Sequence, residues 1–291
     1  MTAFAIRDMT PADLDDVGES TSAGGFGDRR EFFRMAIALG DCHPVVAVAE
    51  GRVVGTGVGA VHGVAGWIGV VFVVPELRRR GIGRALTEAV CERLEGVGCR
   101  SLILVATDLG RPVYEQLGFR EQSQYHMFSG EPLAAMPSPP PGSVLSQIRP
   151  VDIDAIAELD RRVTGEDRLP LIRAFAATGW LLEDEPPGPI RNHIDAAGAG
   201  LRGFLLPTSR GNAALVACRA EDAACLLDLH RHLTPGGNRA WAGLPTENGE
   251  GRRRLAVLGL YAWRTFPRMV RGAEPVWQPE MIWGQFNHAM G

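Results

Sequence analysis

The stretch Ile68–Leu86 reads IGVVFVVPELRRRGIGRAL and decides the fold of the N-terminal half of this chain. Up to Val74 it is apolar except for one glycine, which predicts a strand buried on both faces of a sheet. Over Gly83–Val97 apolar residues recur at helical spacing, and Gly98 ends the predicted helix. A turn between such a strand and such a helix leaves the first N–H groups of the helix unpaired. Together with the positive end of the helix dipole they form an anion site.

The turn itself has the residue types that hold a pyrophosphate. Gly81 and Gly83 let the backbone approach an anion without a Cβ in the way, and the arginines around them add positive potential. A Walker A loop would end in Gly-Lys-Ser/Thr, and a dinucleotide-binding turn would have a small residue where Leu86 stands, so neither motif fits. An ordinary turn with solubilising arginines is the remaining alternative. The residues predicted to surround the anion are Arg78, Arg79, Arg80, Gly81, Ile82, Gly83 and Arg84.

The rest of the first half alternates between strand and helix patterns. Their order is β-α-α-β-β-β-α-β-α-β, which predicts an α/β fold with strands of mixed direction in one sheet. The predicted strands are Phe4–Met9, Pro44–Ala49, Arg52–Val61, Gly66–Val74, Ser101–Ala106 and Arg120–Phe128, and the predicted helices are Pro11–Glu19, Arg29–Leu39, Gly83–Val97 and Arg111–Leu117.

A proline-rich run divides the chain. The segment Pro132–Gly142 cannot form a helix and predicts an extended linker. Residues 5–14 and 147–156 share a strand, a polar break and a helix start with an acidic first turn, which indicates an internal repeat. We therefore predict a domain over residues 1–131, a linker over 132–144 and a related domain over 145–291. In the latter the predicted helices are Ala155–Val163, Leu169–Thr178, Asp222–Leu233 and Arg253–Leu258, and the strands are Gly203–Leu206, Ala213–Cys218, Arg239–Leu244 and a closing Tyr261–Met269.

Composition limits the classes of partner. The net charge of −4 argues against nucleic acid and against an anionic membrane surface. The five cysteines are irregularly spaced and without a CxxC pair, which indicates reduced thiols. His230 and His232 do not share a helix face, so we expect no metal site there. The N-terminus has no signal-peptide pattern and no stretch is long and apolar enough to span a bilayer, so we expect a cytoplasmic protein without membrane contact.

Two segments together resemble a known family. Trp67–Gly83 is similar to the strand-plus-loop core of the GNAT N-acetyltransferases, with the pattern Arg-x-x-Gly-x-Gly after Val-x-Pro, and Ala106–Phe119 is similar to their closing motif Tyr-x-x-x-Gly-Phe. More narrowly, both segments resemble a bacterial branch with a second, degenerate GNAT-like domain, which Arg268–Gly272 also fits. The resemblance implies a tandem GNAT-like fold whose second domain lacks the phosphate loop.

The resemblance also implies a role for each matched residue. The loop Arg78–Gly83, with Arg84, would hold the pyrophosphate of acetyl-CoA. Tyr114 would lie near the sulfur and protonate the departing thiolate as general acid. Thr107 departs from the family pattern, since many relatives have an asparagine there that contacts the cofactor. The backbone groups expected to meet the pantetheine and the thioester carbonyl are those of Val71, Phe72 and Val73.

A general base is not evident. Many GNAT enzymes carry a glutamate at about the position of Trp67, which cannot accept a proton and is expected to line or close the acceptor pocket. An amine with a pKa near 10 must lose a proton before it attacks. A water chain to bulk is one acceptor of that proton, and the candidate side chains are Glu50, His62, Asp108 and His126.

These features imply an N-acetyltransferase that moves the acetyl group of acetyl-CoA to a primary amine of a small molecule or amino sugar. The amine would attack directly, without an enzyme nucleophile. The second domain would shape the acceptor pocket or a homodimer interface. One alternative is a non-catalytic acyl-CoA sensor, which the missing carboxylate at Trp67 favours and Tyr114 disfavours. Another is that both halves are structural and the arginines bind a different anion.

Overall fold

The computed structural model describes residues 3–186, 200–208 and 211–291, which divide into two compact units. The first unit contains the chain up to Gln122 together with Arg268–Glu274 and His288–Met290. The second contains Ser123–Pro267, Pro275–Asn287 and Gly291. The units therefore do not follow the chain order, and the proline-rich segment lies within the second one. The domain limits at residues 131 and 145 describe the sequence repeat and stay a prediction.

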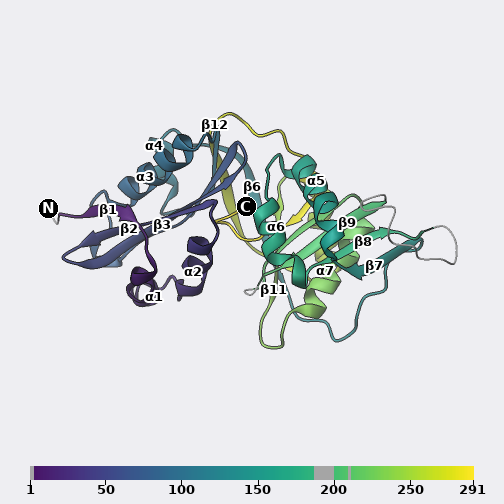
Figure 1. Ribbon diagram of the computed structural model, residues 1–291. Coiled ribbons are helices and arrows are strands. Elements are labelled where there is room, and N and C mark those ends of the chain that lie inside the picture. The colour runs from purple at the N-terminus through teal and green to yellow at the C-terminus, as the bar shows by residue number, and fades with distance from the viewer. Residues whose placement is uncertain (1–2, 187–199, 209–210) are drawn as a thin grey trace. The chain divides into compact units, whose positions relative to one another are not determined.

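The first unit is a twisted mixed sheet with helices on both faces. Strands β1 to β4 are antiparallel neighbours, β4 is parallel to β5, and Arg268–Gly272 of β12 is antiparallel to β5. Helices α3 and α4 lie on one side of these strands and α1 and α2 on the other (Figure 1). The elements of the first half of the chain are β1 (Ala5–Asp8), α1 (Leu14–Ala23), α2 (Arg30–Ala38), β2 (Cys42–Ala49), β3 (Arg52–His62), β4 (Ala65–Val73), α3 (Ile82–Gly96), β5 (Ser101–Val105), α4 (Arg111–Gln116) and β6 (Arg120–Gly130), of which β6 lies mostly in the second unit.

The core of this unit lies between α3 and the sheet. Leu86, Val90 and Leu94 on one side of α3 are buried against apolar residues of β4 and β5. The glycines of β3 allow the close approach, since a Cβ on Gly59 would lie 3.0 Å from both Val90 and Leu94. This packing places the start of α3 at the end of β4.

The second unit repeats the order of elements of the first. Strands β7 to β10 are antiparallel neighbours as β1 to β4 are, β13 pairs with β10, and β11 pairs with β6. The bounds are β7 (Ser143–Gln147), α5 (Ile153–Thr164), α6 (Leu169–Phe175), β8 (Trp180–Asp184), β9 (Leu201–Pro207), β10 (Ala213–Ala217), α7 (Ala220–Leu233), β11 (Ala240–Pro245), α8 (Gly249–Val257), β12 (Tyr261–Gly272) and β13 (Ile282–Gly284). The predicted elements are present in both halves, whereas β8 and β13 were not predicted.

The last strand of each repeat pairs outside its own half of the chain. β12 was expected to close the second half, but its residues Arg268–Gly272 pair with Ser101–Val105 of β5 in the first unit. Conversely, β6 pairs with β11 over Tyr125–Gly130 in the second unit. The apolar pattern predicts that a segment is a strand, but the choice of neighbour depends on contacts distant in sequence. The expected closing role of Tyr261–Met269 is therefore corrected.

Both repeats open with the same buried carboxylate. Asp13 accepts hydrogen bonds from the Thr10 N–H at 2.8 Å and from the Arg7 guanidinium at 2.6 and 2.8 Å. Asp152 accepts from the Arg149 N–H at 2.8 Å and from the Arg149 guanidinium at 2.7 and 3.0 Å. Each carboxylate satisfies a backbone donor at the start of a helix, as in a capping box. This shared device supports the internal repeat.

None of the helices in the described ranges is long and apolar enough to cross a membrane. All five cysteines are free thiols.

Replacing Asp13 by asparagine should lower stability in a pH-dependent way. The hydrogen-bonded Arg7 guanidinium lowers the pKa of Asp13 to about 2. A carboxyl whose pKa is depressed in the folded state stabilises the protein above its unfolded pKa of about 3.9 and loses that contribution as the pH falls toward the folded value. We expect Asp13→Asn to reduce the free energy of unfolding by roughly 1–2 kcal/mol at neutral pH. Urea unfolding at several pH values should show the difference from wild type shrinking toward about pH 2.

Asp15→Asn is the matched control, because the Asp15 side chain is 91% exposed and pairs with Arg30 at the surface. It should change stability by less than about 0.5 kcal/mol. A deficit of Asp13→Asn that stays constant as the pH is lowered would contradict the electrostatic explanation.

Candidate functional site

The site forms where β4 separates from β5. These parallel strands pair from Ala65 opposite Ser101 to Ile68 opposite Leu104. In the described residues no pair joins them beyond that point, although β4 continues to Val73. In the described residues, the edge of β4 after Ile68 is therefore not paired with β5.

A β-bulge lies directly after the separation. The register between β3 and β4 shifts, so that Val70 and Val71 together oppose Gly57. Val70 has a φ of 49°, which is a rare conformation for a β-branched residue. The Thr56 hydroxyl donates a hydrogen bond of 2.9 Å to the Val70 carbonyl. A bulge re-aims the backbone groups that follow it, here those of the predicted residues Val71 to Val73.

The side chains after the bulge are partly or fully buried. Val71 and Val73 pack against the core under α3. Phe72 is 3% exposed, and its ring stacks on Phe26 with centroids 5.5 Å apart. A Cβ on Gly24 would collide with the Phe72 ring, so the loop between α1 and α2 lies directly against this strand. Sequence reasoning missed Val70, Thr56, Phe26 and Gly24, and the one signal for them was a hydroxyl residue inside the apolar strand β3.

The loop after β4 has a backbone conformation that favours an anion. Arg79 and Gly81 have φ values of 60° and 86°, and α3 begins at Ile82 with Gly81 as its N-cap. Because this N-cap is a glycine, it has no side chain to cap the N–H groups of the first turn. Left-handed residues followed by a helix start turn successive N–H groups to one side, which is a favourable arrangement for an anion.

The predicted loop residues divide by what their side chains contact. The Arg78 guanidinium donates to the Val73 carbonyl at 3.0 Å and so ties the loop to the end of β4. Arg84 pairs with Glu88 at 3.0 Å on the surface of α3. Ile82 is 1% exposed and belongs to the core. Arg79 and Arg80 are exposed and add positive potential to the mouth of the turn.

Tyr114 lies on α4 with its ring partly buried. The ring packs edge-to-face on Phe119, with centroids 6.1 Å apart, and a Cβ on Gly110 would lie 3.2 Å from its hydroxyl. Burial raises the pKa of Tyr114 to about 12. The hydroxyl therefore keeps its proton at neutral pH and can donate a hydrogen bond.

The Thr107 hydroxyl accepts a hydrogen bond of 3.2 Å from the Gly110 N–H, so it supports the turn into α4. Trp67 is fully buried, and Arg268 lies over its ring at 5.3 Å. Trp67 is therefore a core residue rather than part of an open acceptor pocket.

Two of the candidate bases are too distant from the bulge to act directly. Glu50 is in the turn before β3, and His62 ends β3, where its Nε2 contacts the Met290 carbonyl at 2.7 Å. The five strand steps from Gly57 to His62 span about 17 Å at a rise of about 3.4 Å per residue, and Glu50 lies outside β3, seven residues before Gly57. His126 contacts Thr246 at 2.9 Å in the second unit. Asp108 is exposed after β5 and stays a candidate.

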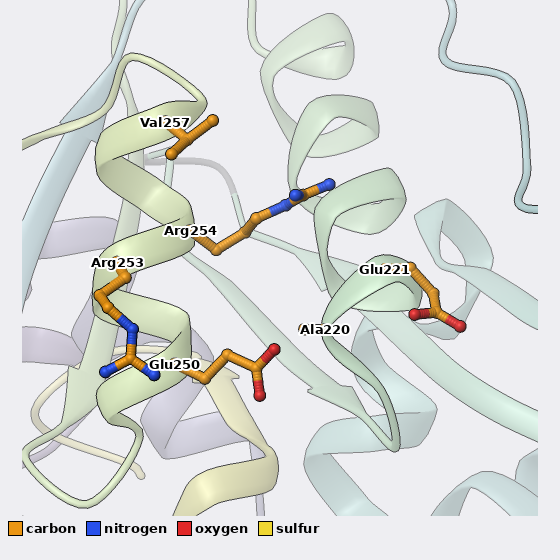
Figure 2. Close-up of a pocket in the computed structure, with 6 residues that line it drawn as sticks. All are labelled: Ala220, Glu221, Glu250, Arg253, Arg254 and Val257. Atoms are coloured by element: carbon orange, nitrogen blue, oxygen red, sulfur yellow. The ribbon is translucent and has the colours of Figure 1, made fainter.

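The start of α7 in the second unit corresponds to the start of α3 in the first, but its first turn carries acidic residues, which the first turn of α3 lacks. β10 leads into α7 through Cys218 and Arg219 alone, and the first turn of α7 carries Glu221 and Asp222. Carboxylates at a helix start occupy the favourable end of the dipole and repel a phosphate. A groove of about 440 Å³ lies between α7 and α8 (Figure 2). Its lining residues are Ala220, Glu221, Glu250, Arg253, Arg254 and Val257.

Comparisons with known proteins agree with this architecture. Residues 14–119 match the acetyltransferase (GNAT) family. A putative acetyltransferase from Pyrococcus horikoshii is 22% identical, with a TM-score of 0.78 over 100% of this chain and 97% of that one. A tandem GNAT protein from the clavulanic acid biosynthesis pathway is 18% identical, with a TM-score of 0.62 over 94% of this chain and 100% of that one. At these identities the likeness shows the fold.

A sequence match concerns a shorter region. The glucosamine 6-phosphate N-acetyltransferase of Trypanosoma brucei brucei is 42% identical over 55 residues, which are 19% of this chain and 37% of that enzyme. The chain thus covers less than half of the length of this relative.

Replacing Gly83 by alanine should separate ligand binding from folding. A Cβ on Gly83 would meet only Val73, at 3.6 Å, and alanine favours a helix by about 0.5–1 kcal/mol over glycine. We expect unchanged or higher thermal stability. Affinity for acetyl-CoA, the cosubstrate of the GNAT family, should fall by at least about tenfold, or about 1.4 kcal/mol, in calorimetric titration.

Gly96→Ala in the last turn of the same helix is the control, because a Cβ there meets open space. It should bind acetyl-CoA as wild type does. Undiminished binding by Gly83→Ala would show that the start of α3 is not where the coenzyme lies.

Proposed function

We propose that this chain, a member of the GNAT acetyltransferase family through its residues 14–119, transfers the acetyl group of acetyl-CoA to a primary amine. The observation that carries the proposal is the course of β4. In succession it leaves β5, bulges at Val70 and enters a turn that leads into the N-terminus of α3. One strand thus offers polar backbone to a thioester and, a few residues later, an anion-binding turn to a pyrophosphate.

The pyrophosphate would lie on the first turn of α3. The N–H groups there and the positive end of the helix dipole favour a negative charge. Arg79 and Arg80 would add attraction from the mouth of the turn, while Arg78 holds the loop against β4. The contrast with α7, whose first turn carries Glu221 and Asp222, supports placing the coenzyme on the first repeat.

The transfer would proceed by direct attack. The lone pair of the amine nitrogen forms a bond to the thioester carbonyl carbon, and the oxygen takes up an electron pair that a backbone N–H after the bulge stabilises. The pair returns as the C–S bond breaks, and sulfur leaves with the bonding electrons. Water accepts one proton from the ammonium before the attack and a second from the nitrogen after its new bond has formed, and the departing thiolate takes up a proton from solvent. With a pKa of about 12, well above that of a thiol, Tyr114 would stabilise the leaving sulfur chiefly by a hydrogen bond.

The acceptor we propose is a small amine, with amino sugars as the first class to test. The similarity over 55 residues to a glucosamine 6-phosphate N-acetyltransferase supports this choice. The net charge of −4 argues against nucleic acid as the acceptor or partner. Release of free CoA from acetyl-CoA across a panel of amines, glucosamine 6-phosphate included, tests the proposal. Tight acetyl-CoA binding without turnover of any amine would instead identify an acyl-CoA sensor.

Replacing Tyr114 by phenylalanine should slow turnover without loss of the coenzyme. The variant keeps the ring that packs on Phe119 but removes the hydroxyl. We expect kcat to fall by about 10²-fold, as for the loss of a group that assists the leaving atom, with the Kd for acetyl-CoA unchanged. Tyr261→Phe is the control, since Tyr261 is 59% exposed and belongs to the second unit. Equal kcat values for Tyr114→Phe and wild type would remove Tyr114 from the mechanism.

A further inference from the structure

Thr56 is a buried hydroxyl residue that contacts the bulge. It lies in β3 between Gly55 and Gly57, and its side chain is inaccessible to solvent. Its Oγ1 donates to the Val70 carbonyl at 2.9 Å. The register of the sheet places it opposite Phe72, directly after the shift that accommodates the extra residue.

The backbone it contacts is strained. A valine at a φ of 49° crowds its Cβ against the backbone, and such conformations persist only where the surroundings hold them. Two contacts hold Val70 in this conformation. The Thr56 hydroxyl fixes the Val70 carbonyl on the side of β3, and the stack of Phe26 on Phe72 clamps the residues that follow.

The direction of the Val70 carbonyl determines that of the next N–H group. In a planar trans peptide the C=O of one residue and the N–H of the next point in opposite directions. The Val70 carbonyl points to the Thr56 hydroxyl, so the Val71 N–H points away from that hydroxyl. β5, which neighbours β4 on the edge opposite β3, pairs with β4 only as far as Ile68.

We propose that Thr56 is a positioning residue for acetyl transfer, whose hydroxyl holds the Val70–Val71 peptide so that the Val71 N–H faces the thioester carbonyl. The inference rests on the function proposed above. When the amine attacks, the carbonyl oxygen holds the electron pair that it returns as the C–S bond breaks, and a fixed N–H stabilises this charge without reorganising. Thr56 touches neither the amine nor the coenzyme and acts through the peptide that it orients.

Thr56→Val and Thr56→Ser test the role of the hydroxyl. Valine keeps the shape of threonine but cannot hold the Val70 carbonyl, whereas serine restores the donor. We expect Thr56→Val to lower kcat by about tenfold or more with the Kd for acetyl-CoA within about twofold of wild type, because the loss falls on the transition state. Thr56→Ser should recover most of kcat.

Thr21→Val is the matched control. Thr21 is equally buried and donates to the Val17 carbonyl at 2.8 Å, but within α1. It should cost stability without lowering kcat. The proposal is overturned if Thr56→Val turns over as wild type does, or if Thr56→Ser is as slow as Thr56→Val. It also fails if Thr21→Val loses as much kcat as Thr56→Val.

A second variant covers the case in which Thr56→Val folds poorly. Glycine adopts a positive φ without strain, so adding Val70→Gly to Thr56→Val should restore thermal stability. Because nothing then holds the peptide plane, kcat should stay low, and full recovery of kcat would overturn the proposal. A wild-type protein without turnover on any amine would remove the proposed function and this inference together. An active wild type with an equally active Thr56→Val would remove the inference alone.

Discussion

The site depends on one constraint, the end of pairing between β4 and β5 at Ile68 and Leu104. In a continuous parallel pair the polar groups along that edge of β4 would be used by β5. Once β5 departs, those groups need another partner, and an elongated ligand with a carbonyl can supply one. The bulge at Val70 adjusts their direction, and the end of β4 leads within a few residues to the start of α3. Separation, bulge and turn therefore act as one device built on a single strand.

The local sequence predicts the helices, the strands and the turn before α3, but it does not predict the bulge in β4. Apolar periodicity predicted β4 and α3 because both have faces against one core, and Gly81 marked the left-handed residue before the helix. Nothing in the run of valines marks Val70, since β-branched residues disfavour a positive φ. Its conformation depends on Thr56, which is fourteen residues earlier, and on a loop between α1 and α2. Such contacts are set by the folded sheet, as is the exchange of β6 and β12, so neither could be predicted from the sequence.

The two repeats differ in charge at the start of the helix that follows their fourth strand. Both open with a buried carboxylate that satisfies a backbone donor, and both carry a helix after their fourth strand. In the first repeat that helix begins at an N-cap glycine with no acidic residue in its first turn. In the second, Glu221 and Asp222 occupy the first turn, and Asp222 is buried against Arg202 at 2.6 Å. The same dipole thus stabilises side chains of the protein in one repeat and can stabilise a ligand in the other.

The strand exchange gives the second repeat a structural role, because one of its strands completes the sheet of the first unit. The sheet of the first unit includes Arg268–Gly272, and Met269 is part of the core under α3. Arg271 of the same strand bonds Glu95 on α3 at 2.5 Å. Without this strand β5 would lack its antiparallel neighbour, and its free edge would expose apolar residues such as Leu102 and Leu104. The C-terminal half is therefore required for the fold that holds the site, even though the start of its own α7 disfavours a phosphate.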